Sequence, residues 1–341
     1  MTNKKHRIFW CLAIFLIVIA LCGITYGKFL SHLKVSEQSY LLIDKDDNID
    51  SVRTKIQQID GVSMFVFDAC IKMSKYSDNI HTGRYRISSD LSTVDLFRNL
   101  RNHSTEPLML VVPSVRTMPE MAGRLARQLM IDSLELVEYL NDTSVCRSLG
   151  YSPETLPALF IPNSYEVYWD TSVENLMKRM KRVNEEFWNS QRLEKAEKVG
   201  LSPLKVYVLA SIIDSETTNN AEKPTVAGLY INRLNKKMLL QSDPTVVFAW
   251  GDFTIRRVLN THLQIDSPYN TYKYIGLPPG PIRVASIAGI DAVLNYEKHD
   301  YIFMCAKEDF SGTHNFAVNG AQHAANARKY QIALNQRGIK R

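Results

Sequence analysis

The run from Leu204 to Pro244 limits the possible folds more than any other part of the chain, because two helical patterns follow one another in it across a short polar break. In the first pattern, Leu209, Ile212 and Ile213 recur at helical spacing and form an apolar face. Glu216 continues that face, so its carboxylate is expected in poor solvent, where the charged form is disfavoured and the pKa rises. A general acid near neutral pH needs such a raised pKa, which makes Glu216 the leading candidate for a reactive group.

A second interpretation of Glu216 stays open, because a glutamate in the last turn of an amphipathic helix is often an edge residue that reaches water. The polar cluster from Thr217 to Asn220 predicts that the helix ends there, since these residue types favour caps and turns. Glu216 would then lie where a helix meets a loop, which is a common place for a residue of a cleft.

A second helix is predicted from about Lys223 to Lys237, with Pro224 in its first turn. Asn232 and Arg233 are polar groups beside its apolar stripe. That stripe consists of Val226, Leu229, Tyr230 and Leu234.

The segment from Gln241 to Thr245 follows this helix, and its Asp-Pro pair is a turn or cap signal. Asp243 has two interpretations. Either it caps a short helix over residues 244–248, or it takes part in chemistry near Glu216.

Composition and charge narrow the class of protein. At 341 residues the chain is long enough for two domains, and 45% hydrophobic content favours packed cores over disorder. Three of the net +6 charges precede residue 8, which leaves a mildly basic remainder that suits an anionic matrix such as a cell wall. No basic run indicates nucleic-acid binding. Cys70, Cys146 and Cys305 are widely spaced and match no metal-ligand spacing, so we expect neither a disulfide framework nor a zinc site. No metal and no cofactor are expected.

One segment departs from this composition. Ile8 to Tyr26 contains no charged residue and is just long enough to cross a bilayer as a helix. Because cations precede it, the positive-inside rule places a short tail, residues 1–7, in the cytoplasm. We expect a single-pass anchor at residues 8–27 in the cytoplasmic (inner) membrane, a linker at residues 28–39, and a periplasmic or otherwise extracytoplasmic remainder.

A cleaved signal peptide is the competing interpretation of the apolar segment. The run is longer than is usual for a signal peptide, and no A-x-A site follows it. A lipoprotein site at Cys22 is disfavoured by the bulky Leu21 that precedes it. The sequence therefore favours an uncleaved anchor.

Residues 40–113 read as one small α+β module. Strands are predicted at Tyr40–Ile43, Gly83–Ile87 and Leu108–Val112, and a helix at Ile49–Ile59. Ser92 opens a further helix, because an acid follows it three residues later. A compact wall-binding module and a plain structural domain are both compatible with this pattern.

Between this module and the central helices, the pattern is mainly helical. Thr117 caps a helix predicted to run through Met130, and Asp132–Tyr139 is a further helix. Leu156–Tyr168 is expected to be irregular. Val173–Val199 is interpreted as one long helix with a solvated face, so its acids are poor catalytic candidates.

After the central helices, two loops rich in Pro, Gly, Asn and Tyr span residues 267–272 and 276–282, and such loops form rigid walls at low entropic cost. Their Tyr rings suit stacking on sugar faces, although Tyr near Pro is also ordinary loop packing. Beyond them we expect a helix at 285–295, a short strand at 301–306 and a final helix at 323–334. His314 is expected on a turn at residues 312–316.

Six motifs in order resemble the YceG-like endolytic murein transglycosylases, a family of membrane-anchored enzymes that cut peptidoglycan glycan strands. They are LASIIDSET (209–217), YINRL (230–234), LLQSDPTV (239–246), YNTY (269–272), GLPPGPI (276–282) and THNF (313–316). A weaker similarity covers TGRYRI (82–87) and LMLVVPSVRTMPEMAGRLA (108–126). The resemblance implies an α+β chain with a LysM-like module at residues 40–113 and a YceG-like catalytic domain at residues 114–341.

The resemblance implies a lytic transglycosylase, a lyase that cleaves the β-1,4 bond between N-acetylmuramic acid and N-acetylglucosamine and so terminates or trims nascent strands. Glu216 matches the catalytic glutamate of the family. It would protonate the glycosidic oxygen and then accept the proton of the muramoyl C6 hydroxyl as a 1,6-anhydro ring closes. Candidate substrate-binding residues are Asn232, Gln241, Asp243, Tyr269, Asn270, Tyr272 and His314.

Several alternatives remain. His314 would orient Glu216 or a substrate hydroxyl, or would be satisfied within the fold. A muramidase that hydrolyses the same bond would need a second carboxyl group, and Asp243 is the nearest acid in a matching motif. A peptidoglycan-binding scaffold of a cell-wall synthesis complex is the non-enzymatic alternative. Penicillin-binding cell-wall synthases are partners that only the resemblance implies.

Overall fold

The computed structural model describes residues 10, 14–19, 23 and 27, and residues 31–337. The expected cytoplasmic tail at residues 1–7 lies outside the described residues, as does much of the expected anchor at residues 8–27. Across the residues that are described, no helix is both long enough and apolar enough to cross a membrane. The described chain has a mixed α+β fold, and it divides into two compact units.

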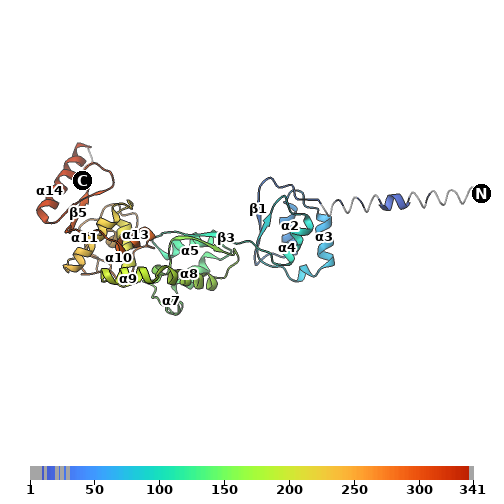
Figure 1. The fold of residues 1–341 in the computed structure, drawn as a ribbon, viewed down its shortest axis with the longest axis horizontal. Coiled ribbons are helices and arrows are strands. Elements are labelled where there is room, and N and C mark those ends of the chain that lie inside the picture. The colour runs from blue at the N-terminus through green and yellow to red at the C-terminus, as the bar shows by residue number, and fades with distance from the viewer. Residues whose placement is uncertain (1–9, 11–13, 20–22, 24–26, 28–30, 338–341) are drawn as a thin grey trace, which may run out of the picture. The chain divides into compact units, whose positions relative to one another are not determined.

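In the first unit, the order is strand, helix, helix, strand, and a third helix follows (Figure 1). The two strands are antiparallel, with Ser39 opposite Ile87 and Ile43 opposite Gly83. Alternate residues of both strands are buried, as expected for strands with one face on a core. The unit comprises residues up to Leu110 with 128–130 and 166–171, and its elements are β1 (Ser39–Ile43), α2 (Ile49–Gln57), α3 (Met64–Met73), η1 (Tyr76–Asp78), β2 (Gly83–Ile87) and α4 (Thr93–Arg101).

The start of α4 confirms the predicted capping signal. The Ser92 hydroxyl accepts a hydrogen bond from the backbone N–H of Asp95, and the Asp95 carboxylate accepts one from the backbone N–H of Ser92, both at 3.2 Å. This reciprocal pair satisfies two donors that the helix leaves without partners. Leu96, Phe97 and Leu100 then lie on the buried face of the helix.

In the second unit, α10 packs against α9, α11, α12 and α13, and Figure 1 labels three of these helices, α9, α11 and α13, around it. Its residues from Val206 to Asp214 are all buried. The sequence predicted one apolar face on this helix, whereas the helix is buried on all sides, as expected for a helix inside a core. The division between the two units falls within two strands, β3 (Leu108–Val112) and β4 (Asn163–Val167). The other elements of the second unit are α5 (Met118–Ala126), α6 (Ser133–Asn141), α7 (Thr143–Leu149), η2 (Leu156–Leu159), α8 (Val173–Phe187), α9 (Ser190–Val199), α10 (Pro203–Glu216), α11 (Lys223–Asn235), α12 (Asp243–Trp250), η3 (His262–Gln264), α13 (Ile287–Leu294), β5 (Phe303–Ala306), β6 (His314–Ala317) and α14 (Gly320–Gln336).

A buried ion pair joins three of these helices. Lys223 at the start of α11 lies 2.7 Å from the Asp214 carboxylate of α10, and both side chains are almost fully buried. Ser286, which caps α13, donates to the same carboxylate through its backbone N–H (2.6 Å) and its hydroxyl (2.8 Å). Gly289 in α13 leaves the necessary room, since a Cβ there would lie 2.6 Å from an Asp214 oxygen.

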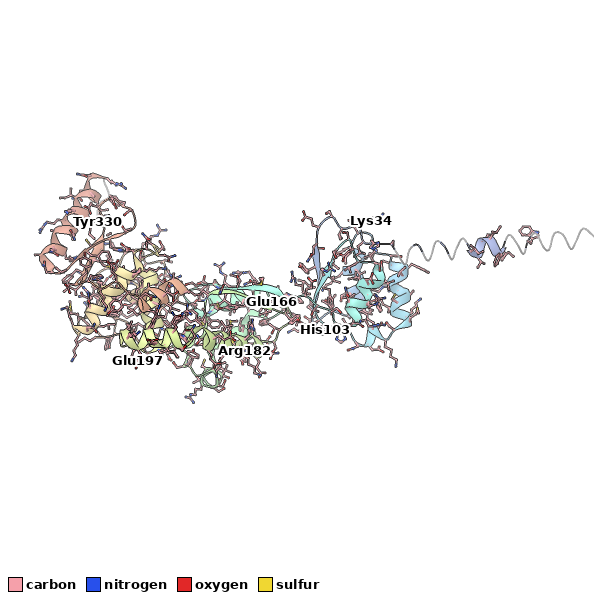
Figure 2. All side chains as sticks on the ribbon, in the orientation of Figure 1. Lys34, His103, Glu166, Arg182, Glu197 and Tyr330 are labelled. Atoms are coloured by element: carbon pink, nitrogen blue, oxygen red, sulfur yellow. The ribbon has the colours of Figure 1, made fainter. Side chains whose placement is uncertain are left out.

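Two helix predictions are wrong in their extent. The helix that Thr117 caps ends at Ala126, not at Met130. The pattern over 173–199 forms two helices, because the chain leaves helical geometry at Trp188 and the Asn189 side chain caps α9. The predicted solvated face is present on both, and Figure 2 labels the exposed Arg182 on α8 and Glu197 on α9.

Two strands are also absent from the predictions. The segment 156–168 is not wholly irregular, since it contains β4, which pairs with β3. His314 is the first residue of β6, not part of a turn, and it lies opposite Ala306 in the antiparallel pair of β5 and β6. The expected turn is complete by Thr313, because Gly312 has the positive φ of 77° that a tight turn between strands requires.

Candidate active site

Glu216 lies on the wall of a cavity of about 360 Å³ in the second unit. The wall is built by the end of α10, by α11, by the turn that leads into α12, by Tyr272, by the hairpin of β5 and β6, and by α14. Its polar side chains are those of Glu216, Tyr230, Arg233, Gln241, Asp243, Tyr272, His314 and His323.

The Glu216 carboxyl group is held on one side only. It is the last residue of α10, and the chain turns to extended backbone at Thr217, as predicted. Its Oε1 accepts hydrogen bonds from the Tyr230 hydroxyl (2.7 Å) and the Ser242 hydroxyl (2.5 Å). Within the described part of the chain, no donor reaches Oε2. A proton on this carboxyl is therefore free to reside on Oε2.

Burial raises the pKa of Glu216 above its ordinary value of 4.5. The hydroxyl donors Ser242 and Tyr230, and the nearby His314, favour the carboxylate and offset part of that rise in pKa, whereas the charge of Asp243 adds to it. The side chain is partly exposed as a whole, so it lies neither in bulk water nor sealed in the core. The interpretation of Glu216 as a purely solvated edge residue does not describe this environment.

The two donors to Glu216 are themselves fixed. Burial raises the pKa of Tyr230 well above 10, so its hydroxyl stays protonated. Ser242 is positioned by the loop at residues 269–272, because its backbone N–H donates to the Thr271 hydroxyl at 3.0 Å. Thr245 of α12 also holds it, by donating to the Ser242 carbonyl at 2.7 Å. The loop motif thus reaches the reactive carboxyl through Ser242.

Asp243 and Tyr272 form a pair at the exposed side of the cavity, where the Tyr272 hydroxyl donates to Asp243 Oδ1 at 2.5 Å. Burial and this hydrogen bond raise the pKa of Tyr272 above its ordinary range. Asp243 is the first residue of α12, and the capping position belongs to Ser242, which makes no side-chain cap. The capping interpretation of Asp243 is therefore wrong.

His314 is held by an acid that the sequence did not single out. Its backbone N–H donates to Glu222 Oε1 at 2.6 Å, and its ring Nδ1 lies 3.0 Å from Glu222 Oε2. The carboxylate accepts, so Nδ1 is the ring nitrogen that donates to it. His314 lines the cavity, and the pairing with Glu222 fixes the orientation of its ring there.

Arg233 shapes the turn that carries Gln241. Its guanidinium donates to the carbonyls of Leu239 (3.1 Å) and Leu240 (2.8 Å) and to the Gln241 side chain (3.3 Å). Gln241 has a left-handed backbone with φ of 53°, which places its exposed side chain at the cavity wall. The buried Arg233 is therefore part of the framework of the site.

Three predicted site residues do not line this cavity. Asn232 donates to the carbonyls of His299 (2.6 Å) and Tyr301 (3.0 Å) and so holds a loop. Asn270 is fully buried, and its amide donates to two backbone carbonyls of the preceding loop. Tyr269 packs against Phe248 with ring centres 4.8 Å apart. The structure thus brings together Glu216, Gln241, Asp243, Tyr272 and His314.

Tyr230, Ser242 and Glu222 are the residues that sequence reasoning missed. Tyr230 fits the apolar stripe of its helix, and only its hydroxyl hinted at a second role. No local signal links Glu222 to His314, which is 92 residues away in the chain.

A carboxyl group with a raised pKa, fixed by two donors at an open polar cavity, is an arrangement suited to general acid–base chemistry. The family model of the YceG-like family matches residues 41–329, and the chain belongs to that family.

Known proteins agree with this assignment. An endolytic murein transglycosylase of Bacillus subtilis (strain 168) is 38% identical over 168 residues, which are 49% of this chain and 46% of that protein. An endolytic murein transglycosylase of Streptococcus pneumoniae serotype 2 (strain D39) is 24% identical over 320 residues, covering 84% of this chain and 57% of that protein. The chain thus spans about half the length of the curated relatives it matches.

A solved structure shows the same fold. The crystal structure of a yceG-like protein from Listeria monocytogenes superimposes with a TM-score of 0.58 at 26% sequence identity. The match covers 85% of this chain and 99% of that chain.

Proposed function

We propose that the chain is an endolytic murein transglycosylase, which cuts the β-1,4 bond between N-acetylmuramic acid and N-acetylglucosamine inside glycan strands and leaves 1,6-anhydro ends. The observation that carries this proposal is the Glu216 carboxyl, which has a raised pKa, is fixed at Oε1 and is open at Oε2 on the cavity wall. The names of the Bacillus and Streptococcus relatives support the same activity. The enzyme would terminate or trim nascent strands.

The reaction needs one carboxyl group in two roles. Protonated Glu216 gives the proton on Oε2 to the glycosidic oxygen as the bond from that oxygen to the muramoyl C1 breaks. The muramoyl C6 oxygen then bonds to C1, and its proton passes to the Glu216 carboxylate, which restores the acid. Tyr230 and Ser242 keep Oε1 engaged in both steps, so the orientation of the carboxyl does not change between them.

The remaining cavity residues bind and orient the sugars. Gln241, Asp243 and Tyr272 present polar groups along one wall, and His314, held by Glu222, orients Glu216 or a substrate hydroxyl. Asn232, Tyr269 and Asn270 support the walls through their loop contacts and do not touch the sugars.

A muramidase is the rival enzyme, and it needs two carboxyl groups about 5–9 Å apart around the bond that is cut. Asp243 is the acid of the cavity wall that would serve as the second one. Its Oδ1 already accepts a hydrogen bond from Tyr272, which favours a positioning role over that of a nucleophile or a base.

The first test is the Glu216→Gln variant of the full chain on purified glycan strands. The amide cannot donate an acidic proton, so activity should fall by at least about 100-fold. Glu197→Gln is the matched control, because it makes the same change on the exposed face of α9. Retained activity in Glu216→Gln would refute the assignment.

Product masses separate the two enzymes. A transglycosylase gives anhydromuramic ends, which are lighter than reducing ends by one water molecule. Two results together would instead favour a hydrolase: only reducing ends among the products, and a loss of activity in Asp243→Asn as large as that in Glu216→Gln.

We further propose that residues 8–27 anchor the chain in the cytoplasmic membrane, with the catalytic unit on the outer side. The strand, helix, helix, strand order of residues 39–87, with the outer strands paired, supports a LysM-like wall-binding role for the first unit. Cell-wall synthases of the penicillin-binding class are the expected protein partners.

The scaffold alternative makes a different prediction. It expects binding to purified sacculi that survives Glu216→Gln and no soluble fragments from the wild type. Release of soluble fragments by the wild type, but not by the variant, would exclude it.

A further inference from the structure

A second cavity of about 380 Å³ lies beside the one that holds Glu216. The two cavities share Asp243, and the second also includes Ser215, the residue that precedes Glu216 in α10. A ligand that occupies the first cavity therefore has the second directly next to it. None of the chemistry described above uses this second space.

The second cavity combines apolar walls with two cations. Its apolar side chains include Val247, Phe248, Phe253, Ile255 and Ile282, and its cations are Arg116 and Arg256.

Neither guanidinium forms an ion pair within residues 31–337, and Arg116 lies over the Phe253 ring with its guanidinium carbon 5.4 Å from the ring centre. Asp243 is the one acid in this lining, and Tyr272 already donates to it. Two unpaired guanidinium groups beside apolar walls suit a ligand that carries carboxylates and small apolar groups together.

We propose that the second cavity binds the peptide branch of the glycan strand through its free carboxylates. This inference rests on the proposed function, because murein carries such a branch on the lactyl group of each muramic acid that keeps its peptide. The branch bears carboxylates and alanine methyl groups, which match the cations and the apolar walls. With the muramoyl residue at Glu216, the second cavity adjoins it across the shared residue Asp243 and so lies within reach of the branch. The enzyme therefore selects strands that still carry peptides.

The test compares two substrates, which are uncrosslinked strands that bear peptides and the same strands stripped by an amidase. The stripped strands keep the lactyl carboxylate, so they separate that group from the peptide. For the full chain, the ratio of kcat/KM on peptide-bearing strands to kcat/KM on stripped strands should exceed one. In the double variant Arg116→Gln, Arg256→Gln that ratio should fall about tenfold, the combined effect of losing two partly exposed ion pairs.

Arg257→Gln is the matched control, because Arg257 is exposed, adjoins Arg256 and does not line the cavity. It should keep the wild-type ratio. An equal loss on both substrates would place the sugar backbone or the lactyl group in the second cavity and overturn the proposal. An unchanged ratio in the double variant would overturn it as well.

A binding measurement keeps this inference separate from the catalytic proposal. In the Glu216→Gln background, the affinity for peptide-bearing strands should exceed that for stripped strands, and the two arginine substitutions should remove the difference. If wild type cuts neither substrate but this difference is present, the proposed function fails and the peptide site stands. If wild type cuts both and the difference is absent, the peptide site fails alone.

Discussion

At the scale of single residues, the burial of Glu216 has two consequences. It raises the pKa of the carboxyl group, so the carboxyl keeps its proton to a higher pH than an ordinary glutamate does, which favours a role as a proton donor. It also disfavours the ionised form in the folded state, so the same residue lowers stability where that form predominates. Tyr230 and Ser242 limit this cost by donating to Oε1, without removing it.

The stability of the Glu216→Gln variant should therefore depend on pH relative to wild type. Below the ordinary carboxyl pKa of 4.5, Glu216 is protonated in both folded and unfolded chains, and the two proteins should be equally stable. As the pH rises through the raised pKa, the folded wild type alone loses stability. Near neutral pH the variant should be the more stable of the two proteins.

Thermal unfolding of both proteins across this pH range measures the difference. Glu197→Gln controls for the loss of a charge, since Glu197 is exposed on α9 and should show no such trend. A variant that becomes less stable than wild type as the pH rises would contradict a raised pKa for Glu216.

Glu222 and His314 show where residue-level prediction stops. The sequence indicated a histidine near the end of the chain, and the structure places it on the cavity wall as the partner of a buried acid. The acid lies in the break between two predicted helices, where a glutamate carries no distinctive signal. Partners that come from distant segments are set by tertiary packing, which no local pattern encodes.

At the scale of elements, the sequence predicted several of the helices whose ends are marked by polar caps, although it missed α7, which Asp142 caps. Ser92 and Thr117 begin helices as expected, and α10 ends at Glu216 as expected. The break between α8 and α9 was missed, because the residues on both sides continue a helical pattern and only Asn189 acts as a cap. The pairing of β5 with β6 was missed because the glycine at position 312 led to the prediction of a turn that included His314.

Prediction of the site also succeeded where the signal is local to one segment of the chain. Glu216 is predictable because its own helix places it in poor solvent, and Asp243 and Tyr272 belong to short motifs that meet at the cavity. Asn270 belongs to the same motif, but a motif does not reveal which of its side chains faces inward. The structure uses Asn270 to fix the loop and Thr271 to hold Ser242.

The buried side chain of Lys223 should be important for the stability of the helices around the site. Lys223→Met removes the cation that neutralises buried Asp214, so the free energy of unfolding should fall by about 3–5 kcal/mol. Chemical denaturation measures this. Lys236→Met is the matched control, because Lys236 is exposed just after the other end of α11 and its loss should change stability by less than about 0.5 kcal/mol. Similar effects of the two substitutions would show that the buried pair does not hold α10, α11 and α13 together.

At the scale of the whole molecule, we propose a different role for each of the two compact units and for the apolar segment at residues 8–27. The second unit contains every residue assigned to the reaction, and the first is the unit that we propose binds the wall. The apolar segment would keep both beside the membrane, where nascent strands emerge. This arrangement depends on the segment remaining attached to the chain.

The full chain should therefore stay with the membrane pellet after an alkaline carbonate wash, and a variant without residues 8–27 should move to the supernatant. An uncharged apolar run of this length is stable inside a bilayer and poorly soluble outside it. Mass spectrometry of the pelleted chain then separates an anchor from a signal peptide, because only an anchored chain retains the peptide with Lys4 and Lys5. Loss of that peptide, or wild type in the supernatant, would contradict an uncleaved anchor, and the first unit would then have to hold the enzyme at the wall by itself.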